Sequence, residues 1–147
     1  MQGRRHAEKL AALPESQLVA VADIDTVRAR SLAAALGVDS VQDYCDLIGE
    51  VSAVVIATPA STHFDITGTL LECGIHVLLE KPFATSMEEA RKLVDLAKSK
   101  GLVLQVGHLE RFNPVVAALT DQVTQPQFVE SIRIAPSNPA VWMSASC

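Results

Sequence analysis

The segment HVLLEKP, at residues 76–82, decides the fold because residues that suit a buried strand run directly into an acid, a base and a proline. A strand that is apolar on both faces is typical of a parallel sheet covered by helices. Pro82 ends this strand because its nitrogen has no hydrogen to donate. Ligands of such open sheets bind just beyond the carboxyl ends of the strands. We therefore expect Glu80 and Lys81 to stand at a binding edge.

The same order of apolar strand, polar turn and amphipathic helix repeats on both sides of this segment. We expect strands at residues 18–22, 38–41, 53–57, 76–79 and 102–106, and helices at residues 3–13, 26–36, 43–48, 62–73, 86–100 and 114–119. Thr26 is the expected N-cap of the second helix, and Ser86 with Glu89 forms a capping box before the fifth. The alternation predicts an α/β fold with a doubly wound parallel sheet, the Rossmann-like dinucleotide-binding architecture.

The length, net charge and cysteine content of the chain narrow its possible functions. A chain of 147 residues makes one domain, or one domain and part of another. Its net charge of −5 and the lack of a basic cluster argue against a nucleic-acid partner. No apolar run approaches the ~20 residues that cross a membrane, and no residues stand at metal-ligand spacing. The three cysteines have no CxxC spacing, which favours reduced thiols and a cytoplasmic location.

The start of the chain departs from the expected pattern. A dinucleotide-binding sheet carries G-x-G-x-x-G after its first strand and an acid about 20 residues further on. Gly3 precedes Asp23 by 20 residues, so it fits the last glycine of that motif, although a lone glycine also suits a flexible terminus. The first strand and the first two glycines are then expected to be missing. The strands at residues 18–22 and 53–57 would lack their shared neighbour, and the phosphate-binding turn would be incomplete.

The composition of the sequence changes near residue 122. Residues 122–127 are polar and contain Pro126, so we expect a dinucleotide-binding domain at residues 1–121. Residues 122–147 would then begin a second, α+β domain, with one strand at residues 128–135. Such a partial strand would be an unpaired edge.

Four motifs together resemble one known family. They are ATP at residues 57–59, His63, EKP at residues 80–82, and GHLERFNP at residues 107–114. This combination resembles the Gfo/Idh/MocA (glucose–fructose oxidoreductase / inositol dehydrogenase) family of NAD(P)-dependent oxidoreductases, from Gly3 to about Ala135. The resemblance implies a Rossmann domain followed by a substrate domain built on a large open sheet, often within a homo-oligomer. It also implies a polyol or sugar-like substrate that exchanges a hydride with the nicotinamide.

The resemblance implies roles for the motif residues. Lys81 would contact the reacting hydroxyl, and Glu80, with Pro82 behind it in the motif, would lie on the nicotinamide side. Thr58 and Pro59 would line the cofactor backbone. His63 matches a position near the bound dinucleotide, although a histidine near a helix start is usually structural.

The side-chain chemistry of Lys81 and Asp23 supports a role in the same site, and for each residue a purely structural or solvent-exposed role is the alternative. The Lys81 ammonium suits developing negative charge on oxygen, but a loop lysine is commonly just solvated. Asp23 would accept hydrogen bonds from the adenosine ribose diol and repel a 2′-phosphate, or it is a helix-capping acid. Ile24 brings no positive charge beside it, although Arg28 and Arg30 are near. These residues favour NAD over NADP as the cofactor.

Two further candidates follow the strand at residues 102–106. His108 is a candidate catalytic residue at its carboxyl end, with a structural role as the alternative. Arg111 is a candidate substrate-binding residue, or else a partner of Glu110. His6 and the arginines beside it, Arg4 and Arg5, lie near the start of the first helix, where an arginine could contact a phosphate; the alternative is that these residues are solvated, which is the commoner case.

One departure from the family keeps three functions open. The family's general acid/base histidine belongs to the second domain, which residues 128–147 are too few to supply. The chain is therefore expected to be a fragment of an oxidoreductase. The alternatives are a module that binds a nucleotide without catalysis and an inactive, truncated remnant.

Overall fold

The computed structural model describes residues 2–122, 128 and 130 of the chain. It divides into two compact units, Met1–Leu109 and Glu110–Cys147. The strand expected at residues 128–135 falls almost wholly outside the described residues, as does the tail at residues 136–147. The domain boundary placed between residues 121 and 122 stays a prediction.

The first unit alternates helices and strands as the sequence predicts. Its regular elements are α1 (Gln2–Ala12), β1 (Ala20–Ala22), α2 (Thr26–Leu36), β2 (Asp39–Val41), β3 (Ala53–Ile56), α3 (His63–Glu72), β4 (His76–Leu79), α4 (Met87–Lys100) and β5 (Leu104–Val106). Short 3₁₀ turns occupy Tyr44–Leu47 (η1) and Ala60–Thr62 (η2), the first where a helix was expected at residues 43–48. The second unit contains most of η3 (Leu109–Phe112) and α5 (Pro114–Gln122).

The strands form two parallel sheets, which confirms the doubly wound α/β class. One sheet has the order β1-β2, with Ala20 opposite Asp39. The other has the order β3-β4-β5, with Ala53 opposite His76 and Val77 opposite Leu104. Among the described strands, β1 and β3 do not pair with each other. This agrees with the expectation that these two strands would lack a shared neighbour, as the two strands beside the first one do in the order 3-2-1-4-5-6.

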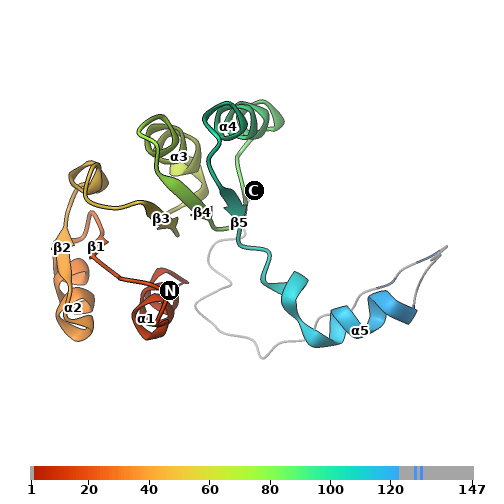
Figure 1. The fold of residues 1–147 in the computed structure, drawn as a ribbon, viewed down its shortest axis with the longest axis horizontal. Coiled ribbons are helices and arrows are strands. Elements are labelled where there is room, and N and C mark those ends of the chain that lie inside the picture. Colours follow the sequence, from red (N-terminus) through yellow and green to blue (C-terminus); the bar gives the residue numbers. More distant parts are fainter. Residues whose placement is uncertain (1, 123–127, 129, 131–147) are drawn as a thin grey trace, which may run out of the picture. The chain divides into compact units, whose positions relative to one another are not determined.

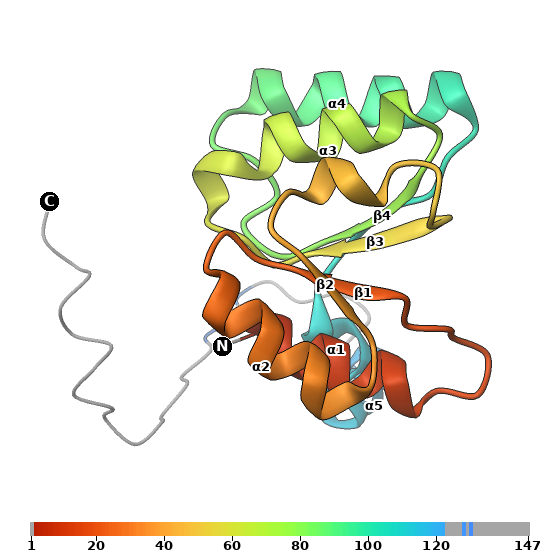
Figure 2. The same cartoon turned by 90° about the vertical axis from the view of Figure 1, so that its left-hand side faces the viewer.

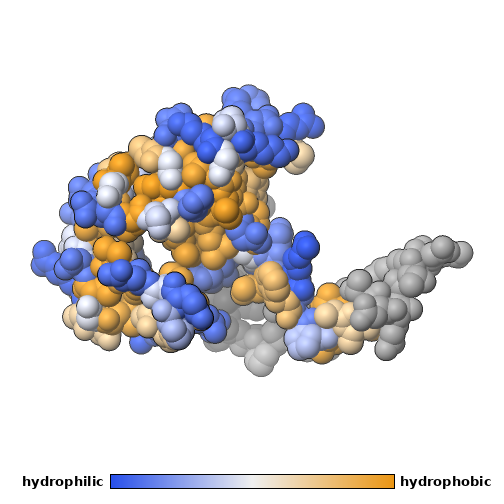
Figure 3. Space-filling model, viewed as in Figure 1, coloured by the Kyte–Doolittle hydropathy of each residue, from blue (hydrophilic) through white to orange (hydrophobic). Residues whose placement is uncertain are grey.

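Helices cover both sides of these strands. Figures 1 and 2 show α3 and α4 side by side on one face of the sheet β3-β4-β5, and Figure 2 shows α1 and α2 on the opposite side of the strands. Leu79 of β4 packs with Leu70 and Leu71 of α3 and with Leu93 of α4, all fully or almost fully buried. Figure 3 shows that the outer surface over α4 is hydrophilic. β4 is therefore the central element of the core.

Helix ends follow local chemistry, with one correction. The N-cap of α2 is Asp25 rather than Thr26, because the Asp25 carboxylate accepts hydrogen bonds from the N–H groups of Val27 and Arg28. Ser86 caps α4 as expected by accepting from the N–H of Glu89.

Candidate functional site

The candidate site begins at one edge of the sheet β3-β4-β5. Because these strands are parallel, the loops that follow them leave the sheet at the same edge. Thr58 and Pro59 follow β3, Glu80 and Lys81 follow β4, and His108 stands just beyond β5. The structure therefore brings these predicted residues to a common edge.

Glu80 is buried at this edge, where His6 and Lys81 contact its carboxylate and Gly107 lies close to it. Its side chain is 3% exposed, and its Oε1 atom lies 2.7 Å from Nε2 of His6 in α1. Its Oε2 atom accepts a hydrogen bond of 3.2 Å from the N–H of Lys81. A Cβ atom added to Gly107 would lie 3.0 Å from the Glu80 carboxyl carbon. The carboxylate thus fills the space that a side chain at residue 107 would need.

His63 joins the loops that follow β3 and β4. It is 1% exposed, with Nδ1 lying 2.7 Å from the carbonyl oxygen of Pro82 and Nε2 lying 2.9 Å from that of Thr58. Carbonyl oxygens only accept hydrogen bonds. Both contacts are hydrogen bonds at once only when each ring nitrogen carries a hydrogen. The Lys81–Pro82 peptide bond that His63 helps to hold is cis.

Lys81 is exposed at this edge. The described residues include no acceptor for its ammonium, although its own N–H is bonded to buried Glu80. Thr58, Pro59 and His108 are exposed too. The edge therefore combines buried polar side chains, Glu80 and His63, with exposed groups that a ligand can reach.

Gly3 places the start of α1 near this edge. It lies in the first turn of the helix, and a Cβ atom added to it would lie 3.7 Å from the Cβ of Ala57, just after β3. An N-terminal helix turn at the end of a parallel strand suits an anionic group, since its N–H groups lack partners within the helix.

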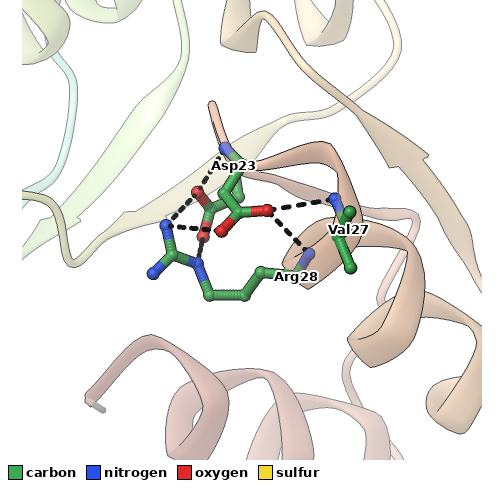
Figure 4. A network of polar contacts seen from close by, with 4 residues as sticks. Asp23, Val27 and Arg28 are labelled. Atoms are coloured by element: carbon green, nitrogen blue, oxygen red, sulfur yellow. Dashed lines mark hydrogen bonds and ion pairs between the residues drawn. The ribbon is translucent and has the colours of Figure 1, made fainter.

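Asp23 follows β1 and forms a network of its own (Figure 4). Arg28 donates to both of its carboxylate oxygens, from Nε at 2.7 Å and from Nη2 at 2.9 Å, and the N–H of Asp25 donates at 3.0 Å. Burial acts to raise the pKa of Asp23, but the hydrogen bonds from Arg28 and Asp25 and the charge of Arg28 bring it below its usual value. Asp23 is therefore a carboxylate at neutral pH.

Arg111 belongs to the second unit, where it is exposed in η3. Its neighbour Glu110 accepts a hydrogen bond of 2.9 Å from the side-chain amide of Asn113. Its proposed contact with substrate stays a prediction.

Sequence reasoning missed two residues of the site. His6 was expected to be solvated, but its side chain is only 19% exposed and contacts Glu80. Its spacing of three residues from Gly3 was a usable signal, since residues at that spacing share a helix face. The sequence indicates Arg28 only as a charge near Asp23, whereas in the structure Arg28 donates two hydrogen bonds to the Asp23 carboxylate.

Other kinds of site find no support in the described part of the chain. Residues 2–122, 128 and 130 contain no group of three or more His, Cys, Asp or Glu side chains placed to hold a metal ion. None of the helices formed by these residues is long and apolar enough to span a membrane.

Comparison with known proteins identifies the fold and its relatives. The sequence model described as "Oxidoreductase family, NAD-binding Rossmann fold" (GFO_IDH_MocA) matches residues 1–108. UDP-N-acetylglucosamine 3-dehydrogenase of Acidithiobacillus ferrooxidans is 40% identical over 138 residues, which are 93% of this chain and 44% of that protein. Inositol 2-dehydrogenase of Rubrobacter xylanophilus is 42% identical over 125 residues, 82% of this chain and 36% of that protein. The chain thus spans less than half the length of these curated relatives.

Solved structures agree with this result. GenD2 from gentamicin A biosynthesis, in complex with NAD, superposes with a TM-score of 0.82 at 31% identity, covering 85% of this chain and 36% of that one. KijD10, a 3-ketoreductase from Actinomadura kijaniata in complex with NADP and TDP-benzene, gives a TM-score of 0.75 at 28% identity, covering 80% of this chain and 37% of that one. Similar structures therefore include one with NAD and one with NADP.

Proposed function

This chain belongs to the Gfo/Idh/MocA family of NAD-binding oxidoreductases, and from that membership we propose that it binds the nicotinamide dinucleotide of a sugar or polyol oxidoreductase. The proposed reaction transfers a hydride between the nicotinamide and a hydroxyl-bearing carbon of a sugar, inositol or sugar derivative. The names of the two relatives, one acting on UDP-N-acetylglucosamine and one on inositol, support this substrate class.

The observation that carries the proposal is the contrast between Glu80 and Lys81. Buried Glu80 is held by His6 and by the backbone of Lys81, while the Lys81 ammonium is exposed and has no acceptor among the described residues. An ammonium at the binding edge, on a backbone that buried Glu80 holds, can donate a hydrogen bond to the oxygen of the reacting carbon. It would stabilise that oxygen as negative charge develops on it.

The remaining residues fit a dinucleotide along the same edge. When bound, a nicotinamide dinucleotide supplies the carbon that accepts or releases the hydride. Gly3 and the first turn of α1 would face the phosphates, and the Asp23 carboxylate would accept hydrogen bonds from the ribose diol. That role of Asp23 supports NAD as the first cofactor.

Four more residues have proposed roles near the nicotinamide. Thr58 and Pro59 would line the cofactor backbone, since both are exposed on the loop after β3. His108 would act near the substrate, because it is exposed just beyond β5. His63 would act through the two loops that it joins, since both of its nitrogens already face protein carbonyls.

A nucleotide-binding module without catalysis is the second candidate. The chain spans 44% of its dehydrogenase relative, and the proposed cofactor residues all lie within residues 3–82. The substrate domain and homo-oligomeric assembly that the family resemblance implies are proposals for the longer relatives. A cytoplasmic location is proposed from the scattered cysteines, of which Cys45 and Cys73 are free.

The test has two readouts on the 147-residue chain. Calorimetric titration with NAD and NADH measures cofactor binding, and absorbance of NADH measures turnover with myo-inositol and with UDP-N-acetylglucosamine. Binding with turnover supports the oxidoreductase, and binding without turnover favours the nucleotide-binding module. Absence of binding would contradict both and favour the inactive remnant.

A further inference from the structure

We propose that this chain forms a weak two-fold dimer in which α5 of one copy packs antiparallel against α5 of a second copy. The contact would use one apolar stripe on the second unit, defined by Phe112, Val115 and Leu119. This inference concerns a different surface from the edge of the sheet β3-β4-β5, so it does not depend on cofactor binding. It also uses a helix, whereas the family resemblance implies assembly through the sheet of the second domain.

The apolar stripe exposes three large side chains to solvent. Phe112 is 75% exposed, Val115 is 65% exposed and Leu119 is 54% exposed. They are three and four residues apart, the spacing at which side chains share one face of a helix. Apolar side chains gathered on one face mark an interaction site more strongly than single exposed residues do.

Backbone hydrogen bonds hold the apolar stripe together across the boundary between η3 and α5. The N–H of Asn113 donates to the carbonyl of Glu110 at 3.1 Å, and the N–H of Ala117 donates to the carbonyl of Asn113 at 3.0 Å. The Asn113 side chain also caps α5 by accepting a hydrogen bond of 3.0 Å from the N–H of Val115. Phe112 and the start of α5 therefore belong to one continuous turn, and the stripe is formed before a partner binds.

The composition of this segment indicates what kind of surface can cover it. Residues 112–120 read FNPVVAALT and include no Asp, Glu, Lys or Arg. A charge buried against such a stripe would lose its water and gain no partner. The covering surface must therefore be apolar and uncharged over the same length. The stripe of a second copy meets this condition, because a two-fold interface brings the same surface of both copies together.

Charges at the two ends of the apolar stripe favour the antiparallel arrangement. Antiparallel packing sets Phe112 of one copy against Leu119 of the second, with the two-fold axis beside Val115. Arg111 is exposed and precedes the stripe, so it would lie beside the C-terminal end of the other α5. Free carbonyl groups make that end partly negative. Parallel packing would instead place the two Arg111 side chains side by side, which is unfavourable.

The size of the contact predicts a weak dimer. The stripe spans seven residues, or about 10 Å of helix. Specific protein interfaces usually bury about 1,200–2,000 Å² in total, and two helical turns from each copy supply less than that. We therefore expect a Kd of about 0.1–1 mM for dimer formation.

The first experiment measures the mass of the 147-residue chain by sedimentation equilibrium, at concentrations from about tenfold below to about tenfold above that Kd. The wild type should change from monomer to dimer over this range. F112S and L119S should each weaken association by about tenfold or more, because a large apolar side chain leaves the interface. A117S is the matched control, since residue 117 is two positions from both Val115 and Leu119 and lies on the opposite face. Circular dichroism checks that each variant keeps the wild-type fold.

Cysteine cross-linking tests the arrangement of the two copies. In a chain whose Cys45, Cys73 and Cys147 are replaced by serine, V115C should form a disulfide between copies on mild oxidation, because the axis passes beside it. A117C should not.

Three results would count against the dimer. A wild type that stays monomeric throughout would overturn it and would leave further residues of a longer chain as the cover of the apolar stripe. Dimers that F112S and L119S do not weaken would place the contact on another surface. Cross-linking of A117C as readily as V115C would refute the proposed arrangement. None of these results bears on cofactor binding, so the proposed function is tested separately.

Discussion

His6 in the first helix contacts Glu80, 74 residues later, with its Nε2 atom 2.7 Å from the Glu80 Oε1 atom. This contact joins α1, whose first turn lies beside the end of β3, to the acid that precedes Lys81. The start of α1, which would face the phosphates, and the segment after β4, which would face the reacting carbon, are thereby joined by a side-chain contact.

The first prediction concerns this contact. H6A removes the partner of a nearly buried carboxylate and should lower the free energy of unfolding by about 1–3 kcal/mol. H6Q, whose amide can still donate a hydrogen bond, should recover part of that loss. Urea denaturation followed by circular dichroism measures both, with R5Q on an exposed neighbouring residue as the control. A stability of H6A equal to that of the wild type would contradict the structural role.

The second prediction concerns Gly107. G107A would place a Cβ atom 3.0 Å from the Glu80 carboxyl group, which cannot move freely because His6 and Lys81 hold it. Overpacking of this kind should cost about 1–3 kcal/mol.

The matched control for Gly107 is Gly68, in α3. A Cβ atom there would lie 4.0 Å from Leu93, an ordinary contact distance. G68A should therefore stabilise the chain by up to about 1 kcal/mol, since alanine favours helix interiors over glycine. Thermal melting of the two variants compares them directly, and loss of stability in both, to the same extent, would count against a specific clash at Gly107.

The third prediction concerns His63. H63F keeps a ring in the buried position but leaves the carbonyl groups of Thr58 and Pro82 without their donor, and should destabilise the chain by about 2–4 kcal/mol. H63Q should lose less, because its amide can donate to one of them. Urea denaturation followed by circular dichroism measures both variants. H63F as stable as the wild type would contradict the role of His63 in joining the two loops.

The fourth prediction follows from the lowered pKa of Asp23. A carboxyl group whose pKa is lower in the folded state than its usual 3.8 stabilises the fold above that pH. This contribution disappears as the pH falls through the folded-state pKa. R28Q should therefore be less stable than wild type at neutral pH, and the difference should narrow below pH 3.8. A difference that grows with acidity would have the wrong sign and would exclude the Arg28 bond as its cause.

The fifth prediction concerns Lys81. In a full-length version that includes the substrate domain, K81A should reduce hydride transfer by about 10²–10³-fold, because a charged donor to the developing oxyanion is lost. Cofactor affinity should change little, since the variant leaves Glu80 and the backbone hydrogen bond of residue 81 in place. Absorbance of NADH and calorimetry give the two readouts. Unchanged turnover would remove Lys81 from the mechanism, and a large loss of cofactor affinity would make it a binding residue instead.

Much of the fold follows from local sequence patterns. The apolar run before Glu80 forms β4, Ser86 caps α4, and Gly37 ends α2 in the left-handed conformation that glycine favours. The sequence also predicted that the strands at residues 18–22 and 53–57 would lack a shared neighbour, and in the structure β1 and β3 do not pair with each other. The N-cap of α2 was placed one residue too late, because aspartate and threonine are both good caps and only the backbone conformation separates them.

The sequence by itself thus determined the α/β class, the family and the polar residues at the ends of the strands, because these depend on periodicity and short motifs. Only the tertiary structure decided which polar groups are buried partners and which are open to a ligand. The sequence shows both His6 and Lys81 only as polar residues beside predicted elements. In the structure, His6 contacts buried Glu80, whereas Lys81 is exposed. The physical reason is that a side chain's role depends on what the fold places against it, and contacts such as His6–Glu80 span too many residues for any local pattern to record.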